Sequence, residues 1–320
     1  MSVDSIIKRI QSERKSLNTE LYNAEGLLRL QETMAAYDGE YKLIWSDELL
    51  KEIKERPKES LHETGLPLLD EIIGGFKEQQ LITVGGHTGH GKTQWGLFLI
   101  EQYDRLNPLM IPLEQSNEEI VEQRSSNGYS VPRFLSPRAL AAKVTVEWIE
   151  ERIVEGIAKH NTKFVLIDHL GYINDFGKDG EMRGENTAYR IGQVMKGLKN
   201  LAKKWNVIIV LLVHISQHDE SKPPSLEAVK NSSDIIQESD MVMLIWRKNA
   251  MKNKVRIYEN KTMVSVQKNR RTGRNATIGL SFDIGTGRYY EENDWVQSMV
   301  QSAQQSVDAE DLFDSLPSGR

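Results

Sequence analysis

The chain has 320 residues, of which 39% are hydrophobic, and a formal net charge of -5 at pH 7. This is enough for one large domain with an appendage. The absence of any run of about 18 apolar residues excludes a membrane-spanning helix. The absence of cysteine excludes disulfides and thiolate metal sites, and the acidic balance excludes a protein coated in basic surface, though not a local basic groove.

Residues 1–60 are polar and helix-prone, with apolar residues spaced three or four positions apart. The apolar positions are Ile6, Ile10, Leu17, Leu21, Leu27 and Leu28. This spacing predicts two or three amphipathic helices, followed by a charged stretch that ends at Pro57. So short a segment cannot form a core alone, and we therefore expect residues 1–60 to be a helical linker or oligomerisation segment.

From Gln80 onward, short apolar runs alternate with helical stretches, which predicts a mostly parallel sheet with crossover helices in residues 61–292. Five runs are typical of strands covered on both faces: LITVGG, PLMIPLE, KFVLIDH, NVIIVLLVH and DMVMLIW. The stretches KTQWGLFLIEQ, NEEIVEQRSS, VEWIEERIVEGIAK and AYRIGQVMKGLKNLAKK are predicted helices. Near the end, KTMVSVQK, ATIGLSFD and GRYYEE predict antiparallel strands.

Residues 293–320 form a polar, acidic tail for which we predict disorder. Leu312, Phe313 and Leu316 are apolar residues set among its acids. Three interpretations stay open: an inert solubilising tail, a segment that docks on a partner, and a segment whose negative charge occupies a basic channel of the protein.

The stretch GGHTGHGKT (85–93) lies between a predicted strand and a predicted helix. Its pattern, with Gly86, Gly89 and Gly91 before Lys92 and Thr93, is that of a phosphate-binding loop. The glycines let backbone N–H groups turn toward phosphates at a helix N-terminus. Lys92 would reach the β and γ phosphates of ATP, and the Thr93 hydroxyl would bind Mg²⁺. We include Gln94, the next residue, among the nucleotide-binding positions.

Three further side chains stand at predicted strand ends, where ligands of such sheets bind. Asp168 ends KFVLID and is placed to hold Mg²⁺ through water. Glu114 follows PLMIPL and is predicted to orient and deprotonate the attacking water, unless it is only an acidic residue of a helix N-terminal cap region. His214 ends VIIVLLVH and is predicted to contact the γ-phosphate, the alternative being a satisfied histidine at a sheet edge.

With these residues in place, the chain resembles the RecA-type motor domain of DnaB-type hexameric replicative helicases, including the phage primase-helicases. The resemblance covers about residues 60–290. The segments that carry it are TGLPLLDEIIGGFKEQQLITVGGHTGHGKT, PLEQS, VLIDHL, SSDIIQESDMVMLIWR and QKNRRTGRNATIGLSFD. His169 stands where many members have tyrosine. The fold that the resemblance implies is a RecA-like P-loop NTPase core of the α/β class.

The resemblance also implies site residues outside the glycine loop. Lys268 and Arg270 fit the residues that reach the ATP of the neighbouring subunit, and Arg271 and Arg274 compete for that role. The alternative for this basic cluster is a solvated turn.

Two long Gly/Pro/Ser-rich loops, residues 174–186 and 216–234, are expected to line a central channel. In the second loop, the residues expected to contact DNA phosphates are Lys230, Asn231, Ser232 and Ser233.

The sequence thus predicts an ATP-dependent DNA helicase with Mg²⁺ as cofactor, translocating on single-stranded DNA and hydrolysing ATP at subunit interfaces. The family implies a homo-hexameric ring, replication partners such as a primase, a loader or a polymerase, no membrane association, and the cytoplasm of a bacterial or phage-infected cell. Two alternatives stay open: a nucleotide-gated assembly or recruitment ATPase, and a RecA-like recombination protein. No collar or primase domain is recognised before residue 60.

Overall fold

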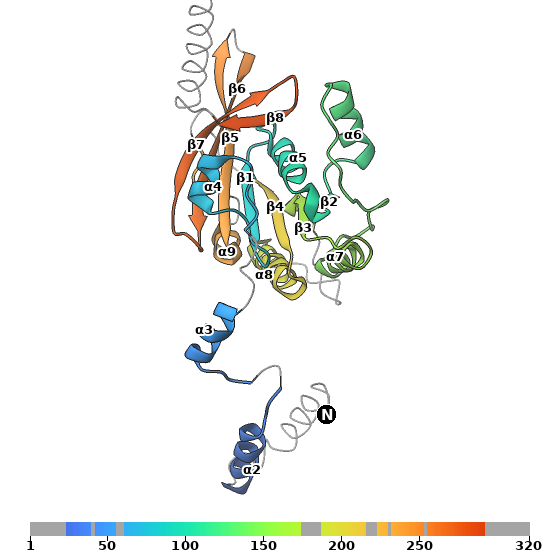
Figure 1. The fold of residues 1–320 in the computed structure, drawn as a ribbon. Coiled ribbons are helices and arrows are strands. Elements are labelled where there is room, and N and C mark those ends of the chain that lie inside the picture. The colour runs from blue at the N-terminus through green and yellow to red at the C-terminus, as the bar shows by residue number, and fades with distance from the viewer. Residues whose placement is uncertain are drawn as a thin grey trace, which may run out of the picture. The chain divides into compact units, whose positions relative to one another are not determined.

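The computed structural model describes residues 24–39, 42–55, 61–173, 187–215, 223–229, 232–252 and 255–291 (Figure 1). The chain divides into two compact units, residues 1–59 and 60–320. Among the described residues, no helix has the length and apolar character needed to cross a membrane. Residues 1–23 of the predicted linker, and the whole acidic tail 293–320, lie outside the described ranges.

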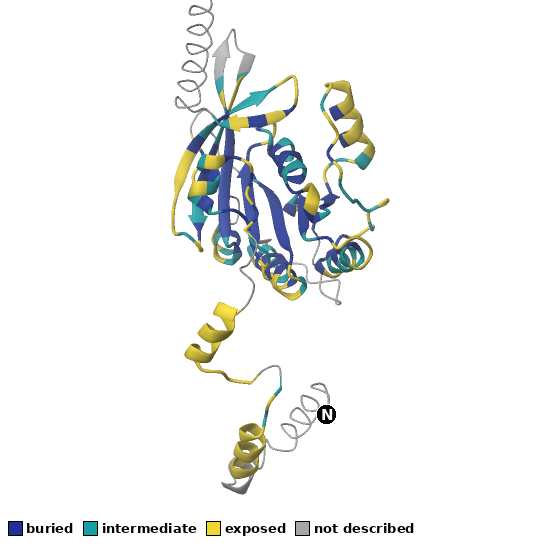
Figure 2. Ribbon diagram, viewed as in Figure 1, coloured by how far each residue is buried: buried dark blue, intermediate teal, exposed yellow. Residues whose placement is uncertain are grey.

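The described part of the first unit contains two helices, α2 (Ala24–Ala35) and α3 (Ser46–Glu55). Their described side chains are largely exposed (Figure 2). The exposed apolar residues of these helices include Leu27, Leu28, Leu30, Met34, Leu49, Leu50 and Ile53. An amphipathic helix normally buries its apolar face against another element. The apolar faces of α2 and α3 are instead left uncovered by the described part of the unit.

The second unit is built on one eight-stranded sheet in the order β2-β3-β4-β1-β5-β6-β7-β8. The strands are β1 (Leu81–Gly86), β2 (Leu109–Pro112), β3 (Phe164–Asp168), β4 (Ile208–His214), β5 (Met241–Lys252), β6 (Val255–Asn269), β7 (Ala276–Asp283) and β8 (Arg288–Glu291). Strands β1 to β5 pair in parallel, whereas β6, β7 and β8 are antiparallel. The predicted α/β class, with antiparallel C-terminal strands, is confirmed.

Six helices are described in this unit: α4 (Pro67–Ile73), α5 (Lys92–Gln102), α6 (Asn117–Ser126), α7 (Val146–His160), α8 (Thr187–Trp205) and α9 (Ser232–Glu238). Three short 3-10 turns, Asp104–Leu106, Leu170–Tyr172 and Leu226–Ala228, complete the described elements. The predicted helices after the glycine loop correspond to α5, α6, α7 and α8.

Two hydrophobic cores cover the two faces of the sheet. On β4, alternate residues divide between them: Ile208, Val210 and Leu212 join the core that contains Trp95 of α5. Ile209, Leu211 and Val213 join the core built with α7 and α8. Because side chains of a strand alternate between faces, burial on both faces requires the continuous apolar run seen in the sequence.

Two helices and one hairpin were not predicted. Helices α4 and α9 have seven residues each, too few for a periodic pattern, although α4 begins at Pro67 and ends at Gly74, whose φ is 69°. Strand β5 continues to Lys252, and strand β6 already begins at Val255. The sequence of this hairpin is polar and shows no alternation of apolar and polar residues. The long second loop, expected to reach residue 234, ends where α9 begins at Ser232.

Candidate functional site

The glycine loop joins the end of β1 to the start of α5. Gly89 and Gly91 have φ values of 78° and 88°, a left-handed conformation that residues with a Cβ rarely adopt. A Cβ on Gly86 would lie 2.8 Å from the carbonyl oxygen of Ile245. Glycine is therefore needed at positions 89 and 91 because of the backbone conformation, and at position 86 because another strand approaches closely.

The loop borders a cavity of about 390 Å³. The cavity wall also includes residues from α6, β5, β6, β7 and β8, so it runs from the loop toward the antiparallel part of the sheet. Its lining residues are Thr88, Gly89, Gly91, Lys92, Thr93, Gln94, Leu97, Glu114, Gln115, Ile120, Gln123, Arg124, Asn127, Tyr129, His214, Arg247, Thr262, Phe282 and Tyr289.

Lys92 is the first residue of α5, and it is only 5% exposed. Its Nζ donates to the carbonyl oxygen of His87 at 3.0 Å and lies 3.2 Å from Nδ1 of His214. Burial lowers the pKa of Lys92 to about 8, although Asp168 and Glu114 pull it upward. A buried cation with so little compensation is suited to a polyanionic ligand in the cavity.

Thr93 and Asp168 meet below the loop. The Thr93 hydroxyl donates to Oδ2 of Asp168 at 2.6 Å, and Asp168 is 3% exposed. Its other oxygen, Oδ1, is buried without a hydrogen-bond partner among the described residues. Burial raises the pKa of the Asp168 carboxyl, and the Thr93 hydrogen bond opposes that shift. An unsatisfied buried carboxylate oxygen beside a hydroxyl is a suitable environment for a hydrated divalent cation.

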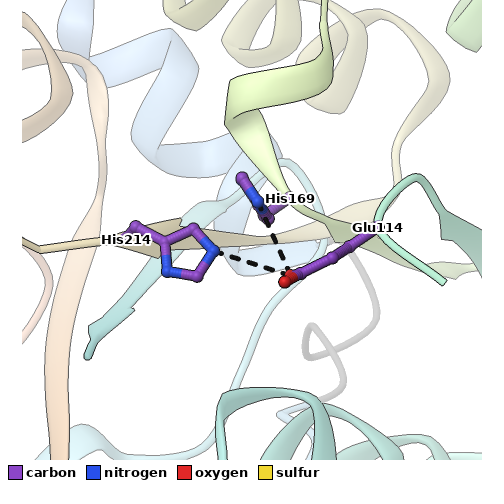
Figure 3. A group of neighbouring side chains, drawn as sticks. All are labelled: Glu114, His169 and His214. Carbon is purple, nitrogen blue, oxygen red and sulfur yellow. Dashed lines mark ion pairs between the residues drawn. The ribbon is translucent and has the colours of Figure 1, made fainter. Parts of the chain in front are cut away.

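Glu114 lies two residues beyond β2 and faces two histidines from neighbouring strands (Figure 3). Its Oε2 is 3.5 Å from Nε2 of His214 and 3.5 Å from Nε2 of His169. Burial lowers the pKa of His169 to about 4, and the adjacent His214 acts in the same direction. Burial and the Lys92 charge likewise lower the pKa of His214, so both rings are neutral at pH 7.

The order of strands explains why these side chains meet. Strands β2, β3, β4 and β1 are consecutive neighbours and parallel, so their carboxyl ends share one edge of the sheet. The backbone N–H of Glu114 donates to the carbonyl oxygen of Asp168 at 3.1 Å, which ties the end of β2 to the end of β3. Ser116 and Glu119 form the capping box of α6, so Glu114 lies two residues before the cap of that helix, and both interpretations of Glu114 stay open.

Gln94 lines the cavity, but its amide is engaged at the cavity wall. Its Nε2 donates to the carbonyl oxygen of Gly287 at 2.7 Å, and its Oε1 accepts from Arg124 at 3.2 Å. Tyr129 lies under the Arg124 guanidinium, which is 5.5 Å from the tyrosine ring centroid. Gln94 therefore connects the start of α5 to α6 and to the turn between β7 and β8.

Lys268 and Arg270 lie at the opposite edge of the sheet from the glycine loop. Lys268 pairs with Val242 at the start of β5, while the loop follows the far end of β1, about 13 Å along the strands. Both side chains donate to the carbonyl oxygen of Gln237 at the end of α9. They therefore do not reach the loop of their own chain.

The two competing arginines are engaged elsewhere. Arg271 donates to the carbonyl oxygens of Ile73 and Gly75, at 2.5 and 2.7 Å. Arg274 donates to the carbonyl oxygen of Glu71 at 3.0 Å. Since cations at the C-terminal end of a helix stabilise it, these contacts fit a structural role beside α4.

Of the predicted DNA contacts, Lys230 and Asn231 lie outside the described residues, as does the predicted channel loop 174–186. Ser232 and Ser233 are the first residues of α9. Backbone N–H groups at a helix N-terminus have no partner within the helix, so a contact with an acceptor outside the helix satisfies them.

His169 was not among the predicted site residues. Its sequence signal is weak, since it is a histidine directly after Asp168, where many members of the resembled family have tyrosine. Only the approach of β2 and β4 to the end of β3 brings it against Glu114 and His214.

Sheet order, the glycine loop and the side chains at the strand ends together define a RecA-like P-loop domain. Within this domain, residues 139–291 match the family model of the DnaB-like helicase C terminal domain. The resemblance to DnaB-like replicative helicases is thereby confirmed. The glycine loop and Glu114 precede the matched segment, so their assignment depends on their own sequence and geometry.

Individual relatives agree with this result. The chain is 26% identical over 220 residues to the "Replicative DNA helicase DnaB" of Mycoplasma pneumoniae, in an alignment that covers 58% of this chain and 46% of that protein. It is 22% identical over 331 residues to the "Probable replicative DNA helicase" of Trieres chinensis, covering 91% and 68%. The chain thus spans about half the length of the first and two thirds of the second.

Two solved structures share the fold. One is described as "The Structure Of A DnaB-Like Replicative Helicase And Its Interactions With Primase", with a TM-score of 0.63, 17% identity, and coverage of 91% of this chain and 76% of the other. The second is described as an ATPase domain, and it has a TM-score of 0.61, 17% identity, and coverage of 77% and 97%. At this identity the likeness concerns the fold alone.

Proposed function

We propose that this chain is the motor of an ATP-dependent, DnaB-like DNA helicase that translocates on single-stranded DNA. The observation that carries the proposal is the convergence of Lys92, the Thr93–Asp168 pair and Glu114 at one edge of the sheet. A phosphate cradle, a cation site and a base are the parts that nucleoside triphosphate hydrolysis needs. The family match and the names of the relatives support helicase activity for this ATPase.

The residues present fit ATP and Mg²⁺. Thr93 and Asp168 would hold the cation, because Asp168 Oδ1 is a buried acceptor without a partner among the described residues. When bound, Mg²⁺ neutralises charge on the phosphates and makes the γ-phosphoryl group easier to attack. We also propose that the motor domain begins after about residue 60 and ends at about residue 292.

Each side chain then has a defined task. Lys92, held under the loop by the His87 carbonyl, places its charge against the phosphates. Glu114 accepts the proton of the attacking water. His214 responds when the γ-phosphate leaves; its position between them, 3.2 Å from Lys92 Nζ and 3.5 Å from Glu114 Oε2, supports this role.

Lys268 and Arg270 complete the site of a neighbouring subunit in this proposal. Their position at the far edge of the sheet is incompatible with a role in their own site, and a head-to-tail ring would bring that edge to the next glycine loop. Single-stranded DNA, a homo-hexameric ring and replication partners such as a primase are part of the proposal; one related structure is described with primase interactions.

The test measures ATP hydrolysis and strand displacement by the intact chain. We expect single-stranded DNA to stimulate hydrolysis, and a forked duplex to be unwound only with ATP and Mg²⁺. Lowering the salt concentration should strengthen DNA binding, because phosphate contacts release counterions. DNA-independent hydrolysis with no unwinding would favour an assembly or recruitment ATPase instead.

A further expectation concerns residues 1–59. Helices α2 and α3 expose apolar side chains such as Leu49, Leu50 and Ile53, and we propose that they pack on the adjacent subunit. Deleting residues 1–55 should leave a soluble, ATP-binding domain that no longer forms rings at micromolar concentration. Light scattering checks the assembly. An unchanged oligomer would remove this role from the N-terminal helices.

A further inference from the structure

His169 brings a second imidazole to the carboxylate of Glu114 (Figure 3). The His169 side chain is 12% exposed, and its ring lies edge-on to the ring of His214, with centroids 4.0 Å apart and an interplanar angle of 89°. Both Nε2 atoms lie 3.5 Å from the same oxygen, Oε2 of Glu114. A single carboxylate oxygen thus lies 3.5 Å from each of two imidazole nitrogens.

The hydrogen bonds of His169 determine which of its nitrogens carries the proton. The backbone N–H of Gly171 donates to His169 Nδ1 at 3.0 Å. A ring nitrogen that accepts an N–H uses its lone pair, so the proton of the neutral ring is on the other nitrogen. His169 Nε2 therefore carries the proton, and it lies 3.5 Å from Glu114 Oε2.

The same reasoning applies to His214. Its Nδ1 lies 3.2 Å from Lys92 Nζ, and a lysine ammonium has donors but no acceptor. The Nδ1 atom of His214 therefore accepts, and its proton is on Nε2. Both imidazoles present N–H groups to Glu114 Oε2. At 3.5 Å these contacts are long, as catalytic hydrogen bonds often are before substrate binds.

The three side chains also match a transition-metal ligand set, because one ligand atom from each lies within 4.8 Å of the others. A metal ion would need a lone pair on each Nε2. The Gly171 N–H occupies the lone pair of His169 Nδ1, so metal binding at Nε2 would require that hydrogen bond to break. The hydrogen bonding therefore favours two donors over two metal ligands.

We propose that His169 is a positioning residue of the ATPase site, whose Nε2–H holds Glu114 Oε2 and leaves the other carboxylate oxygen to face the attacking water. This inference rests on the proposed function, because it requires Glu114 to accept the proton of that water. A neutral donor orients the carboxylate with less loss of basicity than a cationic side chain would cause. His214 shares the contact and also touches Lys92, whereas His169 acts through Glu114.

The test compares two substitutions in the full chain. His169→Leu removes the donor, whereas His169→Gln returns an N–H near the position of Nε2. We expect His169→Leu to lower kcat about 10²-fold with KM for ATP unchanged, since only the orientation of the base is lost. His169→Gln should recover most of the lost kcat. A rise in KM at unchanged kcat, or no recovery by glutamine in a folded protein, would overturn the proposal.

A double-mutant cycle separates positioning from damage to the fold. In the Glu114→Gln background, His169→Leu should cause no further loss of turnover, because the group that it positions is absent. Additive losses would overturn the positioning role while leaving the proposed function intact. If Glu114→Gln alone hydrolyses ATP at the parental rate, both the proposed function of the site and this inference are wrong.

A Co²⁺ titration of the nucleotide-free protein tests directly whether Glu114, His169 and His214 bind a metal ion. We expect no visible absorption band that depends on His169. A cobalt band in the unmodified protein that disappears in both His169→Leu and Glu114→Ala would show that the imidazoles are ligands, and would overturn the donor assignment.

Discussion

Replacing Lys92 by alanine is expected to abolish nucleotide binding, hydrolysis or both. The Lys92 side chain is buried and its ammonium lies 3.2 Å from His214, so the substitution removes a buried positive charge beside the glycine loop. A charge that acts on a polyanion in a water-poor site contributes far more than the same charge in solvent. Fluorescent nucleotide titration and steady-state hydrolysis measure the two effects separately.

Glu114→Gln completes this prediction, because it should keep ATP binding and lose turnover. Glutamine preserves the shape of the side chain but cannot take the proton of water, a contribution of about 10²–10⁴-fold in rate. Lys196→Ala and Glu118→Gln, which alter exposed residues on α8 and α6, are matched controls and should behave like the parent. Parental hydrolysis by Glu114→Gln would show that the base has been assigned to the wrong residue.

Arg270→Ala should lower turnover by about 10³-fold while leaving folding and ATP affinity nearly intact, as expected for loss of an arginine that acts on a neighbouring site. Half of the Arg270 side chain is exposed at the edge of the sheet, so its truncation creates no cavity. Arg274→Ala is the matched control. Its guanidinium contacts the end of α4, and we expect only a small loss of stability.

Mixing two inactive variants tests whether sites are shared between subunits. Arg270→Ala keeps an intact glycine loop and base, whereas Glu114→Gln keeps an intact Arg270. A mixed ring therefore contains interfaces at which both intact residues meet, and part of the activity should return. No recovery, despite demonstrated co-assembly, would count against a shared site.

Much of the fold follows from local sequence patterns. The continuous apolar runs of β1, β3 and β4 predicted strands buried on both faces, because only such strands exclude polar residues from both sides. The glycine loop was equally predictable, since Gly89 and Gly91 occupy a backbone conformation that other residues rarely adopt. Its placement between strand and helix also followed from the neighbouring patterns.

Part of the site was predictable for the same reason. Parallel strands bring their carboxyl ends to one edge of the sheet. Side chains at the ends of neighbouring strands therefore come together, however far apart they lie in the sequence. Glu114 and Asp168, at the ends of the paired strands β2 and β3, illustrate this: the backbone N–H of Glu114 donates to the carbonyl oxygen of Asp168 at 3.1 Å. Their proposed tasks nevertheless remain predictions.

Other features were decided only by tertiary structure, because they depend on which surfaces meet across long stretches of chain. Arg271 and Arg274 could not be separated from Arg270 by sequence, since all three lie in one basic turn. The approach of α4, whose last residue lies 198 positions before Arg271, engages the first two. His169 met Glu114 and His214 only because β3 lies between β2 and β4.

The sequence alone determined which residue types stand at the strand ends, whereas the order of the strands determined which of them touch. Strands pair through backbone hydrogen bonds, which are the same for every residue type. The apolar pattern of a strand buried on both faces therefore does not specify which strands lie beside it. Strand order therefore had to come from the tertiary structure, where the packing of helices on both faces selects one arrangement of the sheet.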